Sequence, residues 1–138
     1  MTSGGGRGLL LRLLDADCFD NFFGMKSGGW VYVMASGRMG TLYIGSTSDL
    51  LVRVSEHKNK TFPGFTADHN VNKLVYYEWH DSLENMVKRE RQMKKWNRNW
   101  KIKVIIDMNP DWVDLYDEVL KSAGFMTQSD YAEWLAEN

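Results

Sequence analysis

The chain has 138 residues, 43% of them apolar, with a formal net charge of −1. These values fit one globular domain and exclude a collagen-like, coiled-coil or wholly disordered protein. The single cysteine, Cys18, excludes an internal disulfide and favours a reducing compartment, so we expect a cytoplasmic protein. No apolar segment approaches the roughly 18 residues of a membrane-spanning helix, and we expect no membrane partner. A near-neutral total charge, taken by itself, argues against nucleic acid binding.

The charge is distributed unevenly along the chain. Residues 88–103 hold eight Lys or Arg against one Glu, a net +7, whereas residues 104–138 hold one Lys against eight acids, a net −7. Trp96 and Trp100 lie among the basic residues, a combination that favours nucleic acid binding. Most charge runs are simply solvated helix faces. The total charge is therefore weak evidence against a nucleic acid partner.

Composition divides the chain into three segments. Residues 1–28 begin with a Gly- and Ser-rich stretch, and we expect them to form a poorly ordered extension. Met25 is an alternative start of the protein. Residues 29–120 carry the regular hydrophobic patterns of a folded domain. Residues 121–138 are predicted to form an acidic helical tail.

The first half of the domain is predicted to contain three strands and a helix. Residues 30–35 and 41–45 are rich in β-branched and aromatic side chains and read as a hairpin. Residues 50–58 follow a group of candidate N-cap residues and are expected to form a short helix. A loop is expected at 59–70, and a third strand at 73–79.

The register of the hairpin decides where its tyrosines point. Pairing of Ala35 with Gly40 would set Tyr32 opposite Tyr43, on one face of the sheet. A shift of one residue would send the two tyrosines to opposite faces.

A long helix is predicted to begin at a capping box that starts with Asp81 and to continue to about Trp96. Met86, Glu90 and Met93 recur at i, i+4 and i+7, so Glu90 lies on the apolar stripe. A carboxylate there needs a partner. Glu90 is either a structural residue paired with an arginine, or a functional residue that acts as a metal ligand or a catalytic acid.

The remaining segments are less regular. Residues 101–108 fit either a strand or a helix, and Asn109-Pro110 ends that element. Residues 111–120 and 127–136 are predicted to form short helices, the second capped by Thr127.

Two tyrosines, an arginine, a histidine and a glutamate follow one another at defined intervals along these elements. Tyr32 lies in the first strand, and Tyr43-Ile44-Gly45 forms the second. Arg53 follows ten residues after Tyr43, His57 four residues later, and Glu90 in the next long helix. This order and spacing resemble the GIY-YIG nuclease family, whose second signature strand is matched in full. Further segments that look like the small stand-alone bacterial branch of that family are 64–66, 74–78, 89–96 and 109–115.

The resemblance covers about residues 30–118 and implies an α+β fold, a small three-stranded antiparallel sheet flanked by helices. It implies a metal-dependent endonuclease that hydrolyses DNA, including branched DNA, in repair or recombination. The residues implied as catalytic are Tyr32, Tyr43, Arg53 and His57. Glu90 is implied as the ligand of Mg²⁺ or Mn²⁺.

The chemistry of these side chains is consistent with that activity. The planar fork of Arg53 suits two phosphate oxygens. With an ordinary pKa of about 6.5, His57 accepts a proton at neutral pH more easily than a phenol with a pKa of about 10. Each residue also has an ordinary structural explanation, such as cross-strand packing for the tyrosines or an ion pair between Arg53 and Glu56.

Two further sets of residues complete the hypothesis. Many family members use an Asn after the Glu, for which Asn97 and Asn109 are candidates.

The main alternative function is that of a nuclease-like module that binds nucleic acid without cutting it, and another is that of a protein-interaction domain. The basic residues expected to bind DNA are Lys88, Arg91, Lys95 and Arg98.

Overall fold

The computed structural model describes residues 28–137, so Cys18, Met25 and all but the last residue of the predicted N-terminal extension lie outside the described residues. A three-stranded antiparallel sheet occupies the centre, in the order β2-β1-β3. Its strands are β1 Gly29–Ala35, β2 Leu42–Thr47 and β3 Lys73–His80.

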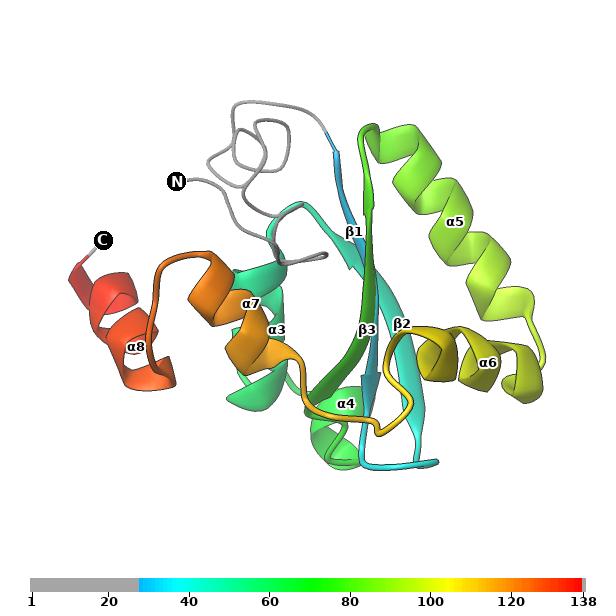
Figure 1. Cartoon of the computed structure of the whole chain (residues 1–138), viewed down its shortest axis with the longest axis horizontal. Helices are drawn as coiled ribbons and strands as arrows, with labels where there is room; N and C mark the ends of the chain where they lie inside the picture. The colour runs from blue at the N-terminus through cyan, green and yellow to red at the C-terminus, as the bar shows by residue number, and fades with distance from the viewer. Residues whose placement is uncertain (1–27, 138) are drawn as a thin grey trace.

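Helices cover both faces of this sheet. In Figure 1, α5 and α6 lie on one side, and α3, α7 and α8 lie on the other. The predicted α+β fold, a small antiparallel sheet flanked by helices, is therefore confirmed. Between residues 28 and 137, no helix is long and apolar enough to cross a membrane. The helices are α3 Leu50–Lys58, α4 Phe65–Asp68, α5 Leu83–Lys95, α6 Arg98–Met108, α7 Tyr116–Ser122 and α8 Gln128–Glu137.

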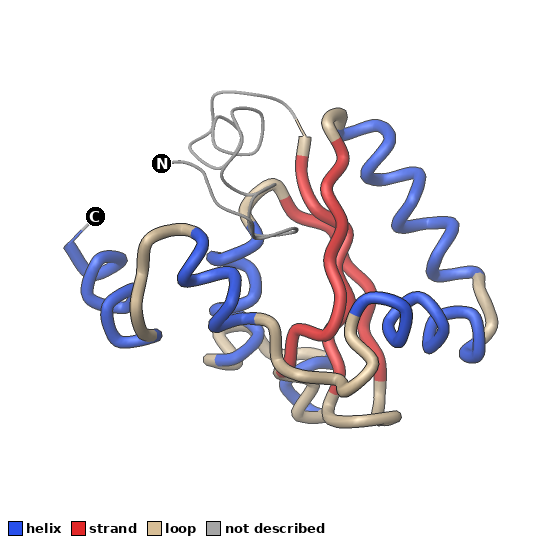
Figure 2. Tube along the Cα trace, in the orientation of Figure 1, coloured by secondary structure: helices blue, strands red, loops and turns tan. Residues whose placement is uncertain are grey.

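The central strand β1 is buried along its whole length because it pairs on both sides and is covered on both faces. Successive side chains of a strand point to opposite faces. Trp30, Tyr32 and Met34 therefore enter the core beneath α3 and α7, whereas Val31 and Val33 enter the core beneath α5 and α6. The continuous apolar run of β1 suits this double burial, and Figure 2 shows helices on both sides of the strands.

The predicted pairing of the hairpin is wrong by two residues. Ala35 pairs with Leu42 instead of Gly40, and Tyr32 pairs with Gly45. The connection is longer than expected because a turn from Gly37 to Gly40 is closed by its own hydrogen bond. A shift of two residues preserves the face of every side chain. The two tyrosines therefore share a face, as predicted, in diagonal rather than direct opposition.

Helix boundaries differ from the predictions where capping side chains act. The predicted loop at 59–70 contains the short helix α4. Ser82, rather than Asp81, caps α5, since its side chain accepts from the backbone N–H of Asn85. Asn97 caps α6 by accepting from the N–H of Trp100 at 3.0 Å, so residues 101–108 continue a helix instead of forming a strand.

The segment between α6 and α7 is held against β3 by two polar side chains. Asn109 is buried and donates to the carbonyl oxygens of Val75, at 3.1 Å, and Val113, at 2.8 Å. Asp114 accepts from the N–H of Leu74 at 3.1 Å. These bonds tie the segment to β3, and α7 begins only at Tyr116 instead of residue 111.

The acidic C-terminal segment packs on the domain. Tyr131 of α8 is 3% exposed and belongs to the same core as Leu120 and the β1 residues on that face. The ring of Phe125 contacts Tyr131 with a centroid separation of 4.9 Å. Thr127 accepts from the N–H of Asp130 at the start of α8, as its predicted capping role requires.

Candidate active site

Three rings, one each from β1, β2 and α3, meet on one face of the sheet. The Tyr32 and Tyr43 ring centroids lie 6.4 Å apart, and the His57 ring lies 5.7 Å from the first and 5.2 Å from the second. His57 reaches the strands because it occupies the last turn of α3, whose apolar side packs on this face of the sheet. The Tyr32 hydroxyl and His57 Nε2 are hydrogen-bonded at 2.9 Å.

The other imidazole nitrogen is also held. His57 Nδ1 lies 3.1 Å from Thr66 Oγ1, a hydroxyl supplied by α4. A histidine with its proton on Nδ1 would donate to Thr66 and accept from Tyr32, a neutral arrangement that satisfies all three groups. The sequence predictions did not include Thr66 in the site. Its place beside Gly64 and Phe65, in a segment that resembles the family, was the available signal.

Gly45 is a second residue absent from the predicted site. It pairs with Tyr32 across the hairpin, and a Cβ atom placed on it would lie 2.7 Å from the Tyr32 hydroxyl oxygen. Glycine is therefore required for the Tyr32 ring to occupy its position. The motif Tyr43-Ile44-Gly45 contained this signal, although its reason is steric and depends on the register.

The surroundings keep both proton-carrying groups neutral. Burial is the largest cause that raises the pKa of the Tyr32 hydroxyl above its ordinary value, followed by neighbouring Tyr43, and Glu90 acts in the same direction. Burial also lowers the pKa of His57 below 6.5, assisted by the positive charge of Arg53. Near neutral pH the pair is therefore a phenol and an uncharged imidazole.

Arg53 lies one turn before His57 on the same side of α3. Its side chain is 44% exposed and lies 3.6 Å from Glu56, an ion pair that solvent weakens. The guanidinium thus lowers the pKa of both Tyr32 and His57, which we call the aromatic pair, and it remains accessible to an anion.

Glu90 approaches from the helix on the other face of the sheet. Its carboxylate accepts a hydrogen bond from Ser46, on the edge strand β2, and lies 2.6 Å from the Lys94 ammonium. Its negative charge helps to raise the pKa of Tyr32. The structure thus joins Tyr32, Tyr43 and His57 by contact, and connects Arg53 and Glu90 to them through electrostatics.

Glu90 fits a site for one Mg²⁺ ion. Among residues 28–137, no three His, Cys, Asp or Glu side chains gather as a protein cage for a metal. Mg²⁺ commonly uses one or two carboxylates together with waters and substrate phosphates, so a single carboxylate suffices. The Glu90 side chain is 19% exposed, and its partner Lys94 is 51% exposed in an i,i+4 pair of the weak surface type. A bound cation would take the place of the ammonium at that carboxylate.

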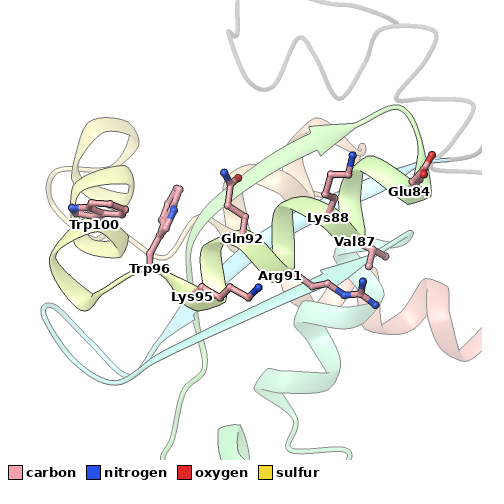
Figure 3. A pocket seen from close by; sticks show the side chains of 8 residues that line it. All are labelled: Glu84, Val87, Lys88, Arg91, Gln92, Lys95, Trp96 and Trp100. Atoms are coloured by element: carbon pink, nitrogen blue, oxygen red, sulfur yellow. The ribbon is translucent and has the colours of Figure 1, made fainter.

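Three of the four basic residues predicted to bind DNA line one groove. Lys88, Arg91 and Lys95 of α5 border it together with Trp96 and Trp100 (Figure 3). Their exposure follows from the orientation of α5, whose Met86 and Met93 face the sheet.

Arg98 and the two candidate asparagines have structural partners. The Arg98 guanidinium donates to the carbonyl oxygens of Met39 and Gly40, at 2.6 and 2.8 Å, and so holds the hairpin turn. Asn97 caps α6, and Asn109 is buried against β3.

The fold and this constellation define a nuclease-like domain. Residues 28–103 match the family model of the GIY-YIG catalytic domain, and the chain belongs to the GIY-YIG family. It is 35% identical over 86 residues to a UPF0213 protein of Syntrophus aciditrophicus strain SB, which covers 62% of this chain and 97% of that protein.

Other similar proteins carry the same description. The UPF0213 protein SSP2268 of Staphylococcus saprophyticus is 30% identical over 76 residues, which covers 55% of this chain and 92% of that protein. The solution NMR structure of the UPF0213 protein BH0048 from Bacillus halodurans is 20% identical with a TM-score of 0.42, and covers 65% of this chain and 95% of that chain.

Proposed function

We propose that this protein is a metal-dependent endonuclease that hydrolyses DNA phosphodiester bonds at the site formed by Tyr32, His57, Arg53 and Glu90. The observation that carries the proposal is the hydrogen bond between the Tyr32 hydroxyl and His57 Nε2, 2.9 Å long, whose tyrosine feels the charges of both Arg53 and Glu90. Membership of the GIY-YIG family supports the same reaction class. We further propose that this cleavage serves DNA repair or recombination.

The attacking water loses its proton through the aromatic pair. Because its pKa is raised, the Tyr32 phenol is a poor source of phenolate at neutral pH. The Tyr32 oxygen instead takes the proton of the water while its own proton passes to His57 Nε2. Thr66 keeps the imidazole oriented for this transfer by its contact with Nδ1.

Charge that develops on the phosphate needs a cation aimed at it. Arg53 donates two charge-assisted hydrogen bonds to the non-bridging oxygens, since its guanidinium is accessible one turn from His57. Tyr43, whose ring contacts His57, positions the phosphate or the water with its hydroxyl. Glu90 would hold Mg²⁺ or Mn²⁺, which when bound polarises the phosphoryl group and stabilises the leaving oxygen.

The test compares cleavage of linear and branched DNA by the full chain in Mg²⁺ and in chelator. Glu90→Gln keeps the volume of the side chain and removes its charge, and we expect it to reduce the metal-dependent rate by at least a hundredfold. Glu118→Gln, an exposed carboxylate on α7, is the matched control and should retain the wild-type rate. Unchanged cleavage by Glu90→Gln would contradict the proposal.

A second measurement separates cleavage from binding. If wild-type protein binds DNA but yields no metal-dependent product on any of these substrates, the proposed hydrolysis is wrong, and a non-cleaving nucleic-acid-binding module is the better description. Binding by such a module should fall steeply with salt as phosphate contacts are lost.

A further inference from the structure

A groove lies along the outer side of α5, where that helix turns into α6. It encloses about 720 Å³, and Figure 3 shows basic side chains along α5 and two indole rings at the turn. We call it the tryptophan groove. Its lining residues are Glu84, Val87, Lys88, Arg91, Gln92, Lys95, Trp96 and Trp100.

The two indoles form an aromatic surface in which Trp100 is exposed and Trp96 is partly buried. Trp100 is 58% exposed, and its ring meets that of Trp96 edge-on, with centroids 6.3 Å apart and planes inclined at 77°. The Arg89 guanidinium lies 5.0 Å from the Trp96 ring and is itself held by Glu78 at 2.9 and 3.3 Å. Asn97 accepts from the backbone N–H of Trp100. The Trp96 ring is therefore held by its contact with Arg89, and the backbone of Trp100 is fixed in the first turn of α6.

The charges around the indoles suit an anion. Lys88, Arg91 and Lys95 border the groove, against one carboxylate from Glu84. The ion pairs that α5 makes within the described part of the chain use other cations, namely Arg89 and Lys94. Three positive charges thus surround an aromatic surface.

A ligand that matches both features is a polyanion that carries flat, unpaired rings. Bases stack on exposed aromatic side chains while basic residues follow the phosphates. In a duplex the base faces are covered by their neighbours, so Trp100 has nothing to stack on unless a base is unpaired. Single-stranded DNA supplies both the ring faces and the charge.

We propose that the tryptophan groove binds single-stranded DNA, with bases stacked on Trp100 and Trp96 and phosphates contacted by Lys88, Arg91 and Lys95. This inference rests on the proposed function, since it names the form of DNA that the protein would hold. The groove is separate from the aromatic pair of the active site: Tyr32 lies on the other face of the sheet. Glu90, on the same helix, faces β2 through Ser46. An unpaired strand held in the groove would therefore lie along the helix that carries the proposed metal ligand, without occupying the Tyr32–His57 pair.

The test measures binding of the full chain to a fluorescein-labelled oligothymidylate by fluorescence anisotropy, in chelator, so that cleavage plays no part. Trp100→Ala should weaken binding by roughly 5- to 150-fold, the usual effect of removing one stacking ring, whereas Trp100→Phe should recover most of it. Phe62→Ala, at an aromatic residue that is similarly exposed but on the loop before α4, is the matched control and should bind as wild type.

Two further probes identify stacking as the cause. An abasic deoxyribose-phosphate strand and a fully paired duplex should each bind wild type and Trp100→Ala equally. Lys88→Gln combined with Lys95→Gln should reduce the slope of log affinity against log salt by about 0.7 per lost phosphate contact, and Lys121→Gln on α7 should leave it unchanged.

The inference is overturned if Trp100→Ala leaves oligothymidylate binding unchanged, or weakens abasic, duplex and oligothymidylate binding alike. Circular dichroism of each variant separates these results from unfolding. Failure of cleavage in Mg²⁺ with Trp100-dependent binding intact would contradict only the proposed function. Cleavage without Trp100-dependent binding would contradict only the proposal that the tryptophan groove binds single-stranded DNA.

Discussion

Gly45 and Tyr32 occupy directly paired positions on neighbouring strands, and the Tyr32 ring fills the space that any side chain at position 45 would need. An added Cβ would lie 2.7 Å from the hydroxyl oxygen of Tyr32 and 3.0 Å from a ring carbon of Tyr43. Tyr32 is almost completely buried and is hydrogen-bonded to His57, so it has little freedom to move. The glycine therefore shapes the site without taking part in its chemistry.

Gly45→Ala should consequently destabilise the fold and displace Tyr32. We expect the free energy of unfolding to fall by about 1–3 kcal/mol, the usual cost of overpacking a core. The DNA cleavage rate should fall further than stability alone explains, because the Tyr32–His57 hydrogen bond is lost. Urea unfolding and a cleavage assay at a temperature where both proteins are folded measure the two effects.

Gly37→Ala is the matched control for that substitution. A Cβ at Gly37, in the hairpin turn, would meet no atom within 4 Å. Its unfolding free energy should therefore change by no more than about 0.5 kcal/mol. Equal effects of the two substitutions would show that Gly45 is not sterically constrained by Tyr32.

The rate of cleavage should depend on pH through His57. Only the uncharged imidazole can accept the Tyr32 proton, and burial and the Arg53 charge hold its pKa below 6.5. The value of kcat/KM should therefore be constant above pH 6.5 and fall as the pH decreases through this lowered pKa. Initial rates across this range, with Mg²⁺ saturating at each pH, give the midpoint.

Arg53 variants test the cause of that midpoint. Arg53→Gln removes the neighbouring positive charge, so the midpoint should rise toward 6.5 along with a lower rate. Arg53→Lys keeps the charge and should keep the midpoint, although it loses the planar fork that suits phosphate. A His57→Gln protein with residual activity should lack this acid limb. An identical limb in that variant would assign the titration to another group.

A polar cluster beneath α5 should make stability depend on pH. Burial alone would raise the pKa of Glu78, but hydrogen bonds from Tyr76, Arg89 and His80 outweigh it and hold that pKa below 4.5. For a carboxyl whose pKa is lowered on folding, the stabilisation is present above the pKa of the unfolded chain and is lost as the pH falls through the folded value. Stability from this cluster should therefore be complete above about pH 4.5 and decrease below it.

Glu78→Gln should remove about 2 kcal/mol of stability at pH 7, the scale of a hydrogen bond to a charged group. Its loss relative to wild type should shrink as the pH is lowered below 4. Urea midpoints at several pH values measure this, with Glu118→Gln as an exposed control. A constant difference between wild type and Glu78→Gln at all pH values would contradict the assignment.

Several parts of the site could be predicted from local sequence. Arg53 and His57 share a side of α3 because residues four apart on a helix do so. Tyr32 and Tyr43 share a face because Tyr32 pairs with Gly45, which is one strand period of two residues from Tyr43. The same period explains why the predicted register, which was wrong by two residues, still placed each side chain on the correct face of the sheet. Met86 and Met93 point to the core as their spacing indicates, and Glu90 lies between them on α5.

Other parts depended on contacts between distant segments. Thr66 joins the site because α4 forms within a segment predicted to be a loop, and it meets His57 only in the folded chain. The guanidinium of Arg98 donates to carbonyl groups of the hairpin turn nearly sixty residues earlier, a contact that its local sequence does not indicate. Hydrogen bonds between such segments leave no periodic pattern in the sequence.

By itself, the sequence determined the basic, tryptophan-rich character of residues 88–103 through its composition, and its resemblance to the GIY-YIG family implied the class of fold and the candidate catalytic side chains. Only the tertiary structure decided that Glu90 reaches the edge strand at Ser46, that Gly45 makes room for Tyr32, and that Trp96 and Trp100 border a groove with Lys88, Arg91 and Lys95. The physical reason is that these relationships arise from packing between elements. Helix and strand periods place a side chain on one face of its element. The strand register and the packing of α5 and α6 on the sheet decide which residues that face contacts.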